Sequence, residues 1–375
     1  MAEPFKNMFN ITLVRDMAQH FERHNPQFNS AAFITDATSN FDSLELKERS
    51  NQIALAMHRH LSNDFNETAT LLLQSLDKNP ADDLKDAAIT ENGIAGWAIM
   101  PMAHYVSLYG VNHFETSMQL LKEFTKRFTS EFAIRSFLLQ NQERALYYIF
   151  EWAQDENRHV RRLASEGSRP RLPWAEQLPE LVADPTPLLD LLDMLKDDPE
   201  PYVRKSVANS LNDISKDHPE LVTSIASDWF SADASPERHR LVKHGCRTLI
   251  KQGNKQLLTV LGYGEPNLKV NALKHPSRVH FGEALPFTLS LTSTSTKKQP
   301  LIIDYIIHHQ KSAGHTTPKV FKWKTTTLGA QKTIELSKNH PFKKITTRVY
   351  YPGEHKLEIM INGQSFLTAS FELCM

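Results

Sequence analysis

The residues best suited to chemistry lie in one stretch of fifteen, Val160–Trp174, which reads VRRLASEGSRPRLPW. It holds four arginines, one carboxylate and one tryptophan. Arginines at this density repel one another unless an anion lies nearby, so the stretch points to an anionic ligand outside the chain. Glu166 precedes Gly167, a predicted helix end, where the macrodipole disfavours a negative charge by about 0.3–1 kcal/mol. A carboxylate placed there suits chemistry better than stability. The alternative is an arginine-rich surface loop with an incidental glutamate.

A repeat places this stretch in a larger helical array. An acidic or Ser/Pro turn, followed by Val and a basic residue, occurs at Val160, Val203 and Val242, at intervals of 43 and 39 residues. These intervals are close to the roughly 40–47 residues of HEAT and armadillo units, in which antiparallel helices form each repeat. Stacked repeats expose a concave face, where basic residues can follow a phosphate backbone. The basic positions that would form such a ladder are Arg161, Arg204 and Lys243, with Arg162 and Lys205 beside them.

The chain divides into a helical and a strand-forming part. Apolar residues recur at helical spacing through the first part, and the apolar segment 92–109 predicts a buried helix broken at Pro101. Near residue 262 the pattern changes to seven or eight short alternating runs, with a hairpin turn predicted at Asn362-Gly363. We therefore expect a mainly α fold, with a HEAT-like repeat domain at residues 1–262 and an all-β immunoglobulin-like (Ig-like) sandwich at residues 263–375.

Composition and charge narrow the classes of protein to which the chain can belong. No run of about 18 apolar residues occurs, and the N-terminal segment lacks the order of a signal peptide. Cys246 and Cys374 are the two cysteines, which excludes a disulfide framework and favours the cytoplasm. Residues 264–375 carry 13 Lys and 2 Arg against 6 Glu and 1 Asp, a net charge of +8, so the remainder carries −8. This asymmetry indicates a polyanionic partner, although lysines also protect sheet edges.

The motifs resemble those of a known family. VRRLASEGSRPRLPW, DPEPYVRKSVANSLNDISKDHPE and VKHGCRTLIKQGN are similar to the AlkC branch of the alkylpurine DNA glycosylases, which are HEAT-like repeat enzymes. The resemblance covers roughly residues 110–262. The tail, with its YIIHHQK segment, resembles the AlkC proteins that carry an Ig-like C-terminal domain. Residues 1–110 match by their helical character alone.

The resemblance implies hydrolysis of the N-glycosidic bond of cationic methylated bases, such as 3-methyladenine and 3-methylcytosine, in duplex DNA and without base flipping. We expect no cofactor, and the residues suggest no metal site. A cationic base is already a good leaving group, so the protein must stabilise positive charge on the sugar and position a water, which carboxylates can do. An aromatic ring beside the lesion adds attraction to its cationic face. We expect a monomer that binds alkylated double-stranded DNA.

The resemblance also implies a catalytic set. Glu166 and Asp213 would position the water and stabilise the cation, Glu131 would support them, and Trp174 would rest against the lesion or its deoxyribose. Each has an alternative. Glu131 follows Ser130, a possible N-cap, and could serve the helix dipole. Asp213 could be polar filler on a solvated helix face, and Trp174 could plug a junction between repeats.

Basic residues of the same region are the predicted contacts to phosphates, because arginine can bind phosphate through two donors and lysine as a point charge. Arg161 could instead form structural pairs. The β domain could be a second DNA contact through Lys322, Lys324, Lys343, Lys344 and the pair His308/His309, which point to opposite faces and so cannot form a metal pair. The predicted DNA-binding residues are Arg162, Arg169, Arg171, Arg204, Lys205, Lys243 and Arg247.

A protein of a different class remains possible on the same residues. A non-catalytic HEAT adaptor could bind nucleic acid or an acidic protein through the concave face, since fold alone does not determine function. The carboxylates separate the two hypotheses, because they weaken the attraction of a pure polyanion binder for phosphate. A nuclease would need a tight cluster of acidic metal ligands, and the sequence offers no convincing one.

Overall fold

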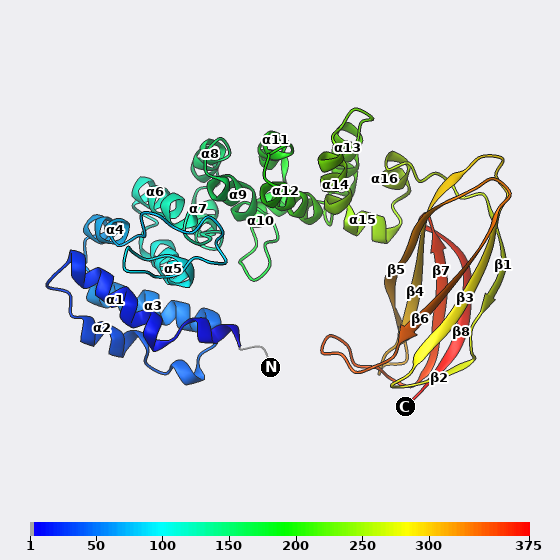
Figure 1. The fold of residues 1–375 in the computed structure, drawn as a ribbon, viewed down its shortest axis with the longest axis horizontal. Helices are drawn as coiled ribbons and strands as arrows, with labels where there is room; N and C mark the ends of the chain where they lie inside the picture. The colour runs from blue at the N-terminus through cyan, green and yellow to red at the C-terminus, as the bar shows by residue number, and fades with distance from the viewer. Residues whose placement is uncertain (1–3) are drawn as a thin grey trace. The chain divides into compact units, whose positions relative to one another are not determined.

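The computed structural model describes residues 4–375, which fold into a helical array followed by a two-sheet sandwich (Figure 1). The predicted fold class, a HEAT-like array with a C-terminal Ig-like sandwich, is confirmed. The chain forms two compact units, Met1–Asp217 and His218–Met375. The last helix ends at Val260 and the first strand begins at Leu268, whereas the units divide earlier because the helices after Asp217 cluster with the sandwich. The boundary at 262/263 therefore stays a prediction.

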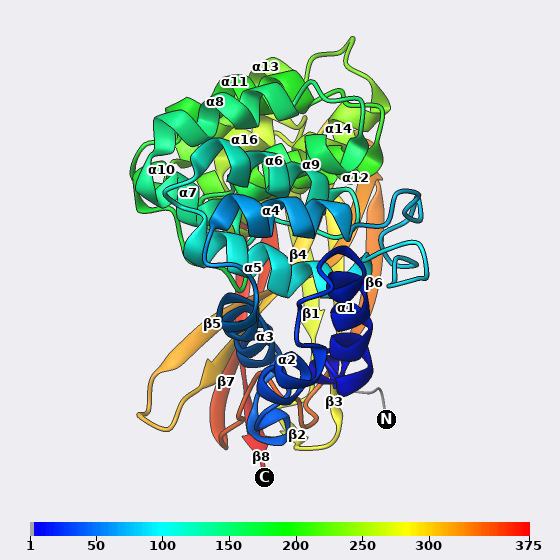
Figure 2. The same cartoon turned by 90° about the vertical axis from the view of Figure 1, so that its left-hand side faces the viewer.

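Paired helices build the first unit. Figures 1 and 2 show α8 and α11 in one layer and α9 and α12 in the other, and α9 packs directly on α8, α11 and α12. Stacking of this kind buries one stripe of each helix in a common core. The elements are η1 (Phe5–Met8), α1 (Ile11–His24), α2 (Ser30–Ala37), η2 (Phe41–Ser43), α3 (Leu46–His60), α4 (Phe65–Gln74), η3 (Gly96–Ala98), α5 (Ile99–Tyr109), α6 (Phe114–Thr125), α7 (Ile134–Gln140), α8 (Gln142–Trp152), α9 (Arg158–Gly167), α10 (Pro179–Ala183), α11 (Thr186–Leu195) and α12 (Pro201–Ile214).

Local sequence explains the two helices that matter most here. The side chain of Asn157 accepts hydrogen bonds from the backbone of His159 and Val160, which caps the N-terminus of α9. Helix α12 begins at a proline, whose missing N–H is no loss in a first turn. Apolar residues at helical spacing form its core stripe, and all four are buried: Val203, Val207, Leu211 and Ile214.

Two details of the helical prediction are wrong. Pro101 does not break a helix but lies in the first turn of α5, where no backbone donor is needed. The third repeat is out of register with the first two. Val160 and Val203 are the third residues of α9 and α12, whereas Val242 is the seventh of α14 (Pro236–Gly245), about one turn further along.

The second unit combines four short helices with the sandwich. The hairpin predicted at Asn362-Gly363 is confirmed, with both residues at positive φ, 46° and 74°. Gly253, which ends α15, approaches Gly363 so closely that a Cβ there would lie 2.7 Å from the Gly363 Cα. The helices are α13 (Pro219–Trp229), α14, α15 (Arg247–Gln252) and α16 (Lys255–Val260). The strands are β1 (Leu268–Lys274), β2 (Arg278–His280), β3 (Ala284–Ser293), β4 (Gln299–Gln310), β5 (Thr316–Leu328), β6 (Thr333–Pro341), β7 (Gly353–Ile361) and β8 (Gln364–Cys374).

The sheets have the orders β1-β3-β6 and β2-β8-β7-β4-β5, and apolar side chains of both fill the space between them. His308 and His309 point to opposite faces of β4, as predicted: His308 pairs with Glu358, whereas His309 is buried. The prediction that His309 is a surface contact to DNA is therefore wrong. No helix in residues 4–375 is both long and apolar enough to span a membrane.

Candidate functional site

The ends of two neighbouring helices bring two of the predicted carboxylates together. Glu166 lies in the last turn of α9 and Asp213 in the last turn of α12, and these helices pack on each other. The predicted helix end at Gly167 is confirmed. This end packs tightly, because a Cβ on Gly167 would lie 2.6 Å from Cγ2 of Ile134 in α7. Both acids thus oppose a helix dipole, which is unfavourable without other partners.

Arginines supply those partners and link three predicted carboxylates into one network. Arg162 lies 2.5 Å from Oε2 of Glu131 and 3.5 Å from Oε1 of Glu166. Arg169 lies 2.6 Å from the same Glu166 oxygen, and its Nε donates to Oδ2 of Asp213 at 2.8 Å. Glu131, Glu166 and Asp213 form what we call the carboxylate cluster. The structure therefore brings together three of the four predicted catalytic residues.

The cluster is buried and closely balanced in charge. The side chains of Glu166 and Asp213 are 7% and 2% exposed, and Lys216 adds a third cation 3.0 Å from Oδ1 of Asp213. Burial opposes the charge of Arg169, but its hydrogen bond to Asp213 and the charge of Glu166 outweigh that cost and raise the pKa of Arg169. The pKa of Arg162 is raised in the same way, with Glu131 as its main partner. Removing one member would leave buried charge uncompensated.

One oxygen of Glu166 and one of Glu131 have no partner within residues 4–375. Both contacts to Glu166 are made through Oε1, and both side-chain contacts to Glu131 through Oε2, from Arg162 and Thr129. Asp213 instead uses both oxygens, for Arg169 and Lys216. Glu166 and Glu131 thus each keep an acceptor that a water could use.

The geometry removes two of the alternatives to a functional role. Asp213 is not on a solvated face, because it is almost fully buried. Glu131 lies in a turn before α7 and not in its first helical turn, and the Ser130 hydroxyl donates to the carbonyl of Leu121 and does not cap the helix. The carboxylate of Glu131 is directed to Arg162 instead.

A buried arginine that sequence reasoning missed holds the loop after α9. Arg135 of α7 donates to the carbonyls of Gly167, Arg169 and Glu176 at 3.0, 2.8 and 2.6 Å. It neutralises the negative end of α9 and fixes residues 168–178, which we call the Trp174 loop. Burial lowers the pKa of Arg135 to about 10, and the charge of Arg169 adds to the effect, so the guanidinium stays protonated at neutral pH. The available signal was a lone arginine in the apolar run AIRSFLL.

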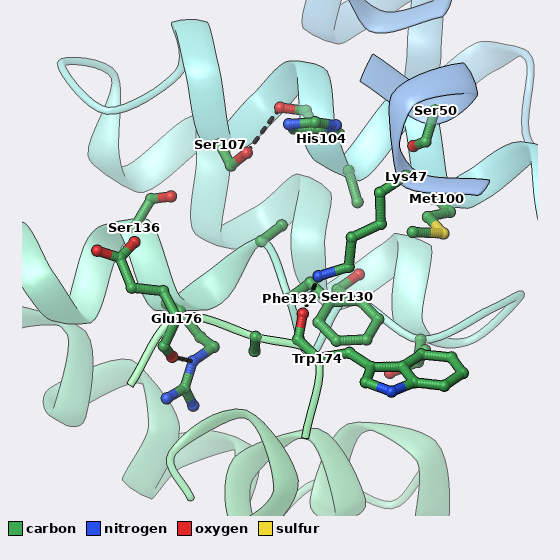
Figure 3. Close-up of a pocket in the computed structure, with 15 residues that line it drawn as sticks. Lys47, Ser50, Met100, His104, Ser107, Ser130, Phe132, Ser136, Trp174 and Glu176 are labelled. Carbon is green, nitrogen blue, oxygen red and sulfur yellow. Dashed lines mark hydrogen bonds between the residues drawn. The ribbon is translucent and has the colours of Figure 1, made fainter. Parts of the chain in front are cut away.

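Trp174 stands on this loop with an exposed side chain. It is 72% exposed, so the alternative that it plugs a junction between repeats is wrong. Its φ of +65° is unusual for a bulky residue and costs about 1–3 kcal/mol. The Nζ of Lys47, on α3, donates to the Trp174 carbonyl and lies 5.4 Å from the centre of the Phe132 ring (Figure 3). Sequence reasoning also missed Lys47, for which no local signal exists.

The predicted phosphate contacts differ in how far other side chains already occupy them. Arg162 and Arg169 are occupied by the carboxylate cluster, and the 7% exposure of the Arg169 side chain leaves it little surface for a phosphate. Arg171 pairs with Asp217 through two donors at 2.8 and 2.9 Å. Because Arg169 bridges two buried carboxylates, the structure favours a positioning role for it.

The repeat arginines serve a local purpose. Arg161 donates to the carbonyls of Asp155 and Glu156 and pairs with Asp198, which confirms the structural alternative for it. Arg204 likewise donates to the carbonyls of Asp198 and Pro199, six and five residues before it. The remaining candidates lie as follows: Lys205 is exposed on α12, Lys243 is exposed on α14 with Nζ 5.4 Å from the Phe230 ring centre, and Arg247 donates to the carbonyl of His244.

Within residues 4–375, no three His, Cys, Asp or Glu side chains are grouped so as to hold a metal ion.

Comparison with known proteins agrees with this arrangement. Residues 128–225 match the family described as "DNA alkylation repair enzyme", and residues 269–375 match the C-terminal Ig-like domain family of the protein YhaZ. YhaZ of Bacillus subtilis (strain 168), described as uncharacterized, is 37% identical over 372 residues, which cover 98% of this chain and 99% of YhaZ. The alkylpurine DNA glycosylase AlkC of Pseudomonas fluorescens, solved bound to DNA containing an abasic site analog, is also 37% identical, with all of both chains covered and a TM-score of 0.89. The chain therefore belongs to the AlkC branch of the DNA alkylation repair enzymes, the branch with an Ig-like C-terminal domain.

Proposed function

We propose that the protein is a DNA repair glycosylase that hydrolyses the N-glycosidic bond of cationic methylated bases, such as 3-methyladenine and 3-methylcytosine, in duplex DNA. The observation that carries the proposal is the carboxylate cluster beside the Trp174 loop, in a chain that is 37% identical to an AlkC glycosylase over its full length. A protein that only bound phosphate would gain nothing from three carboxylates among its arginines.

The free oxygens of the cluster suggest distinct roles. Oε2 of Glu166 would hold the attacking water, and the negative charge of Glu131 and Glu166 would stabilise the cation that develops at C1′. Asp213, with both oxygens occupied, would fix Arg169 and thereby the orientation of Glu166. Trp174, exposed and held by its backbone, would rest against the lesion or its deoxyribose without base flipping.

Basic side chains of each unit would contact duplex DNA. Lys205, Lys243 and Arg171 are the predicted contacts that leave most charge available to phosphates, because they are exposed or paired at the surface. Arg162, Arg204 and Arg247 would contact phosphate only in addition to their present partners. We propose a monomer in the cytoplasm as the working form.

The decisive experiment is release of 3-methyladenine from an alkylated duplex by the wild type and by Glu166→Gln. We expect the wild type to release the base and the variant to lose at least about 100-fold in rate, as when a transition-state charge partner is removed. Glu151→Gln, a change at an exposed site on α8, is the matched control and should keep the rate. If folded wild type binds the duplex but releases nothing, and Glu166→Gln binds it more tightly, the adaptor hypothesis replaces the glycosylase.

A further inference from the structure

A cavity of about 220 Å³ lies beside the carboxylate cluster in the first unit (Figure 3). Helices α3, α5 and α7 and the Trp174 loop all contribute to its wall. Thr129, whose hydroxyl donates to Glu131, and Arg135, which holds the Trp174 loop, belong to both the wall and the surroundings of the cluster. A molecule released at the cluster would therefore find the cavity next to it.

The wall is suited to a flat aromatic molecule with polar edges. The rings of Phe132 and Trp174 line it, and alanine side chains keep it open. Ser107, Ser136 and His104 also line it with half-buried polar side chains. A ligand with a ring nitrogen at its edge can accept a hydrogen bond from a serine hydroxyl of this wall.

The charges of the wall distinguish the two forms of a methylated base. Lys47 and Arg135 bring two cations, against one carboxylate from the exposed Glu176. When the C1′–N bond breaks, its electron pair passes to the base, which loses its positive charge. Water adds hydroxide to C1′ and gives up a proton to solvent through a carboxylate. The cationic lesion would thus be repelled by this wall, whereas the neutral product would not.

We propose that this cavity receives the neutral methylated nucleobase after the glycosidic bond is cleaved. The proposal rests on the proposed function and extends it to the fate of the product. The base stacks against Phe132 and Trp174 and accepts a hydrogen bond from the half-buried Ser136. Occupation of the cavity removes the leaving group from C1′ and so hinders the reverse reaction.

Binding of free 3-methyladenine to the full-length protein, measured by calorimetry without DNA, tests the site. We expect saturable binding at one site per chain. Ser136→Leu extends a half-buried side chain of α7 into the cavity and should weaken binding at least about tenfold. Gln140→Leu, at an exposed position of the same helix outside the cavity, should leave binding unchanged. Circular dichroism checks the fold, and Ser107→Leu from α5 replaces Ser136→Leu if that variant unfolds.

Charge provides a second readout. The cationic nucleoside 1-methyladenosine should compete with 3-methyladenine at least about tenfold more weakly than neutral adenosine does. Equal competition, absence of saturable binding, or unchanged binding by the cavity-filling variants would overturn the proposal. Base release from alkylated duplex is assayed separately. Release without binding of the free base refutes the cavity alone, whereas binding without release refutes the glycosylase and with it the product role.

Discussion

The two units each bury a group of titratable side chains, and they treat the charge in opposite ways. In the first unit, Glu166 and Asp213 are buried with a cation within 3 Å of each. In the second, His309, His340 and His355 are buried in the sandwich, and each has one ring nitrogen without a hydrogen-bond partner within residues 4–375. We call these three the histidine cluster.

The difference shows how burial of an ionisable group is tolerated. A carboxylate can stay charged in the interior when an arginine satisfies it, and the pair is then a rigid unit that can be placed at a site. The histidines lack such partners and stay neutral: burial, with the charge of Arg348, lowers the pKa of His309 to about 3 and that of His340 to about 4. Paired charge holds the carboxylate cluster together in the first unit, and neutral rings serve packing in the second.

The largest effect should come from breaking the paired cluster. Arg169→Met leaves Glu166 and Asp213 buried without their shared cation, so we expect the free energy of unfolding to fall by about 3–5 kcal/mol. Denaturant unfolding followed by circular dichroism measures this. A loss below about 1 kcal/mol would mean that solvent reaches the carboxylates and that the cluster is not a buried unit.

The second largest effect on stability should come from lowering the pH, which acts on the histidine cluster. The unfolded chain takes up protons at these histidines near pH 6.5 and the folded chain does not, so the free energy of unfolding should fall as pH drops below about 6.5, by up to about 1.4 kcal/mol per pH unit per histidine. Burial raises the pKa of Asp304 to about 6, which works in the opposite direction and offsets one histidine. Thermal unfolding between pH 7 and 5 is the measurement.

The variant His355→Phe sharpens this test. Burial lowers the pKa of His355, and its ring lies among Phe342, Phe371 and His309, so phenylalanine suits the site. The pH dependence of the variant should be shallower than that of the wild type. Identical slopes would show that His355 does not contribute.

The smallest effect should come from a charge pair outside both clusters. Arg171 and Asp217 form a two-donor pair at the surface, with side chains 27% and 32% exposed. Solvent screens such a pair, so Arg171→Gln should cost less than about 1 kcal/mol and serves as the control for Arg169→Met. A cost equal to that of Arg169→Met would remove the distinction between buried and surface pairs, whereas weaker DNA binding alone would fit a phosphate contact.

Local sequence patterns were enough to predict the helices and strands and part of the candidate site. Helical and alternating periodicity depend on neighbouring residues, so the core stripe of α12, the turn at Asn362-Gly363 and the helix end at Gly167 could all be predicted. The motif around Glu166 also indicated the family. The register of the third repeat could not be predicted, because an insertion of one turn leaves a Val-basic pair intact.

The partners of each charge were decided by the tertiary structure. Four arginines in one stretch look alike in sequence, yet Arg161 holds a neighbouring turn, Arg169 bridges two buried acids, and Arg171 stays at the surface. Lys47 reaches Trp174 across 127 residues of chain. Such pairings depend on the distance between helix ends and on burial, neither of which is encoded by spacing along the chain. The sequence alone therefore determined which residues could do the chemistry, whereas the packing of α9 on α12 decided which of them meet.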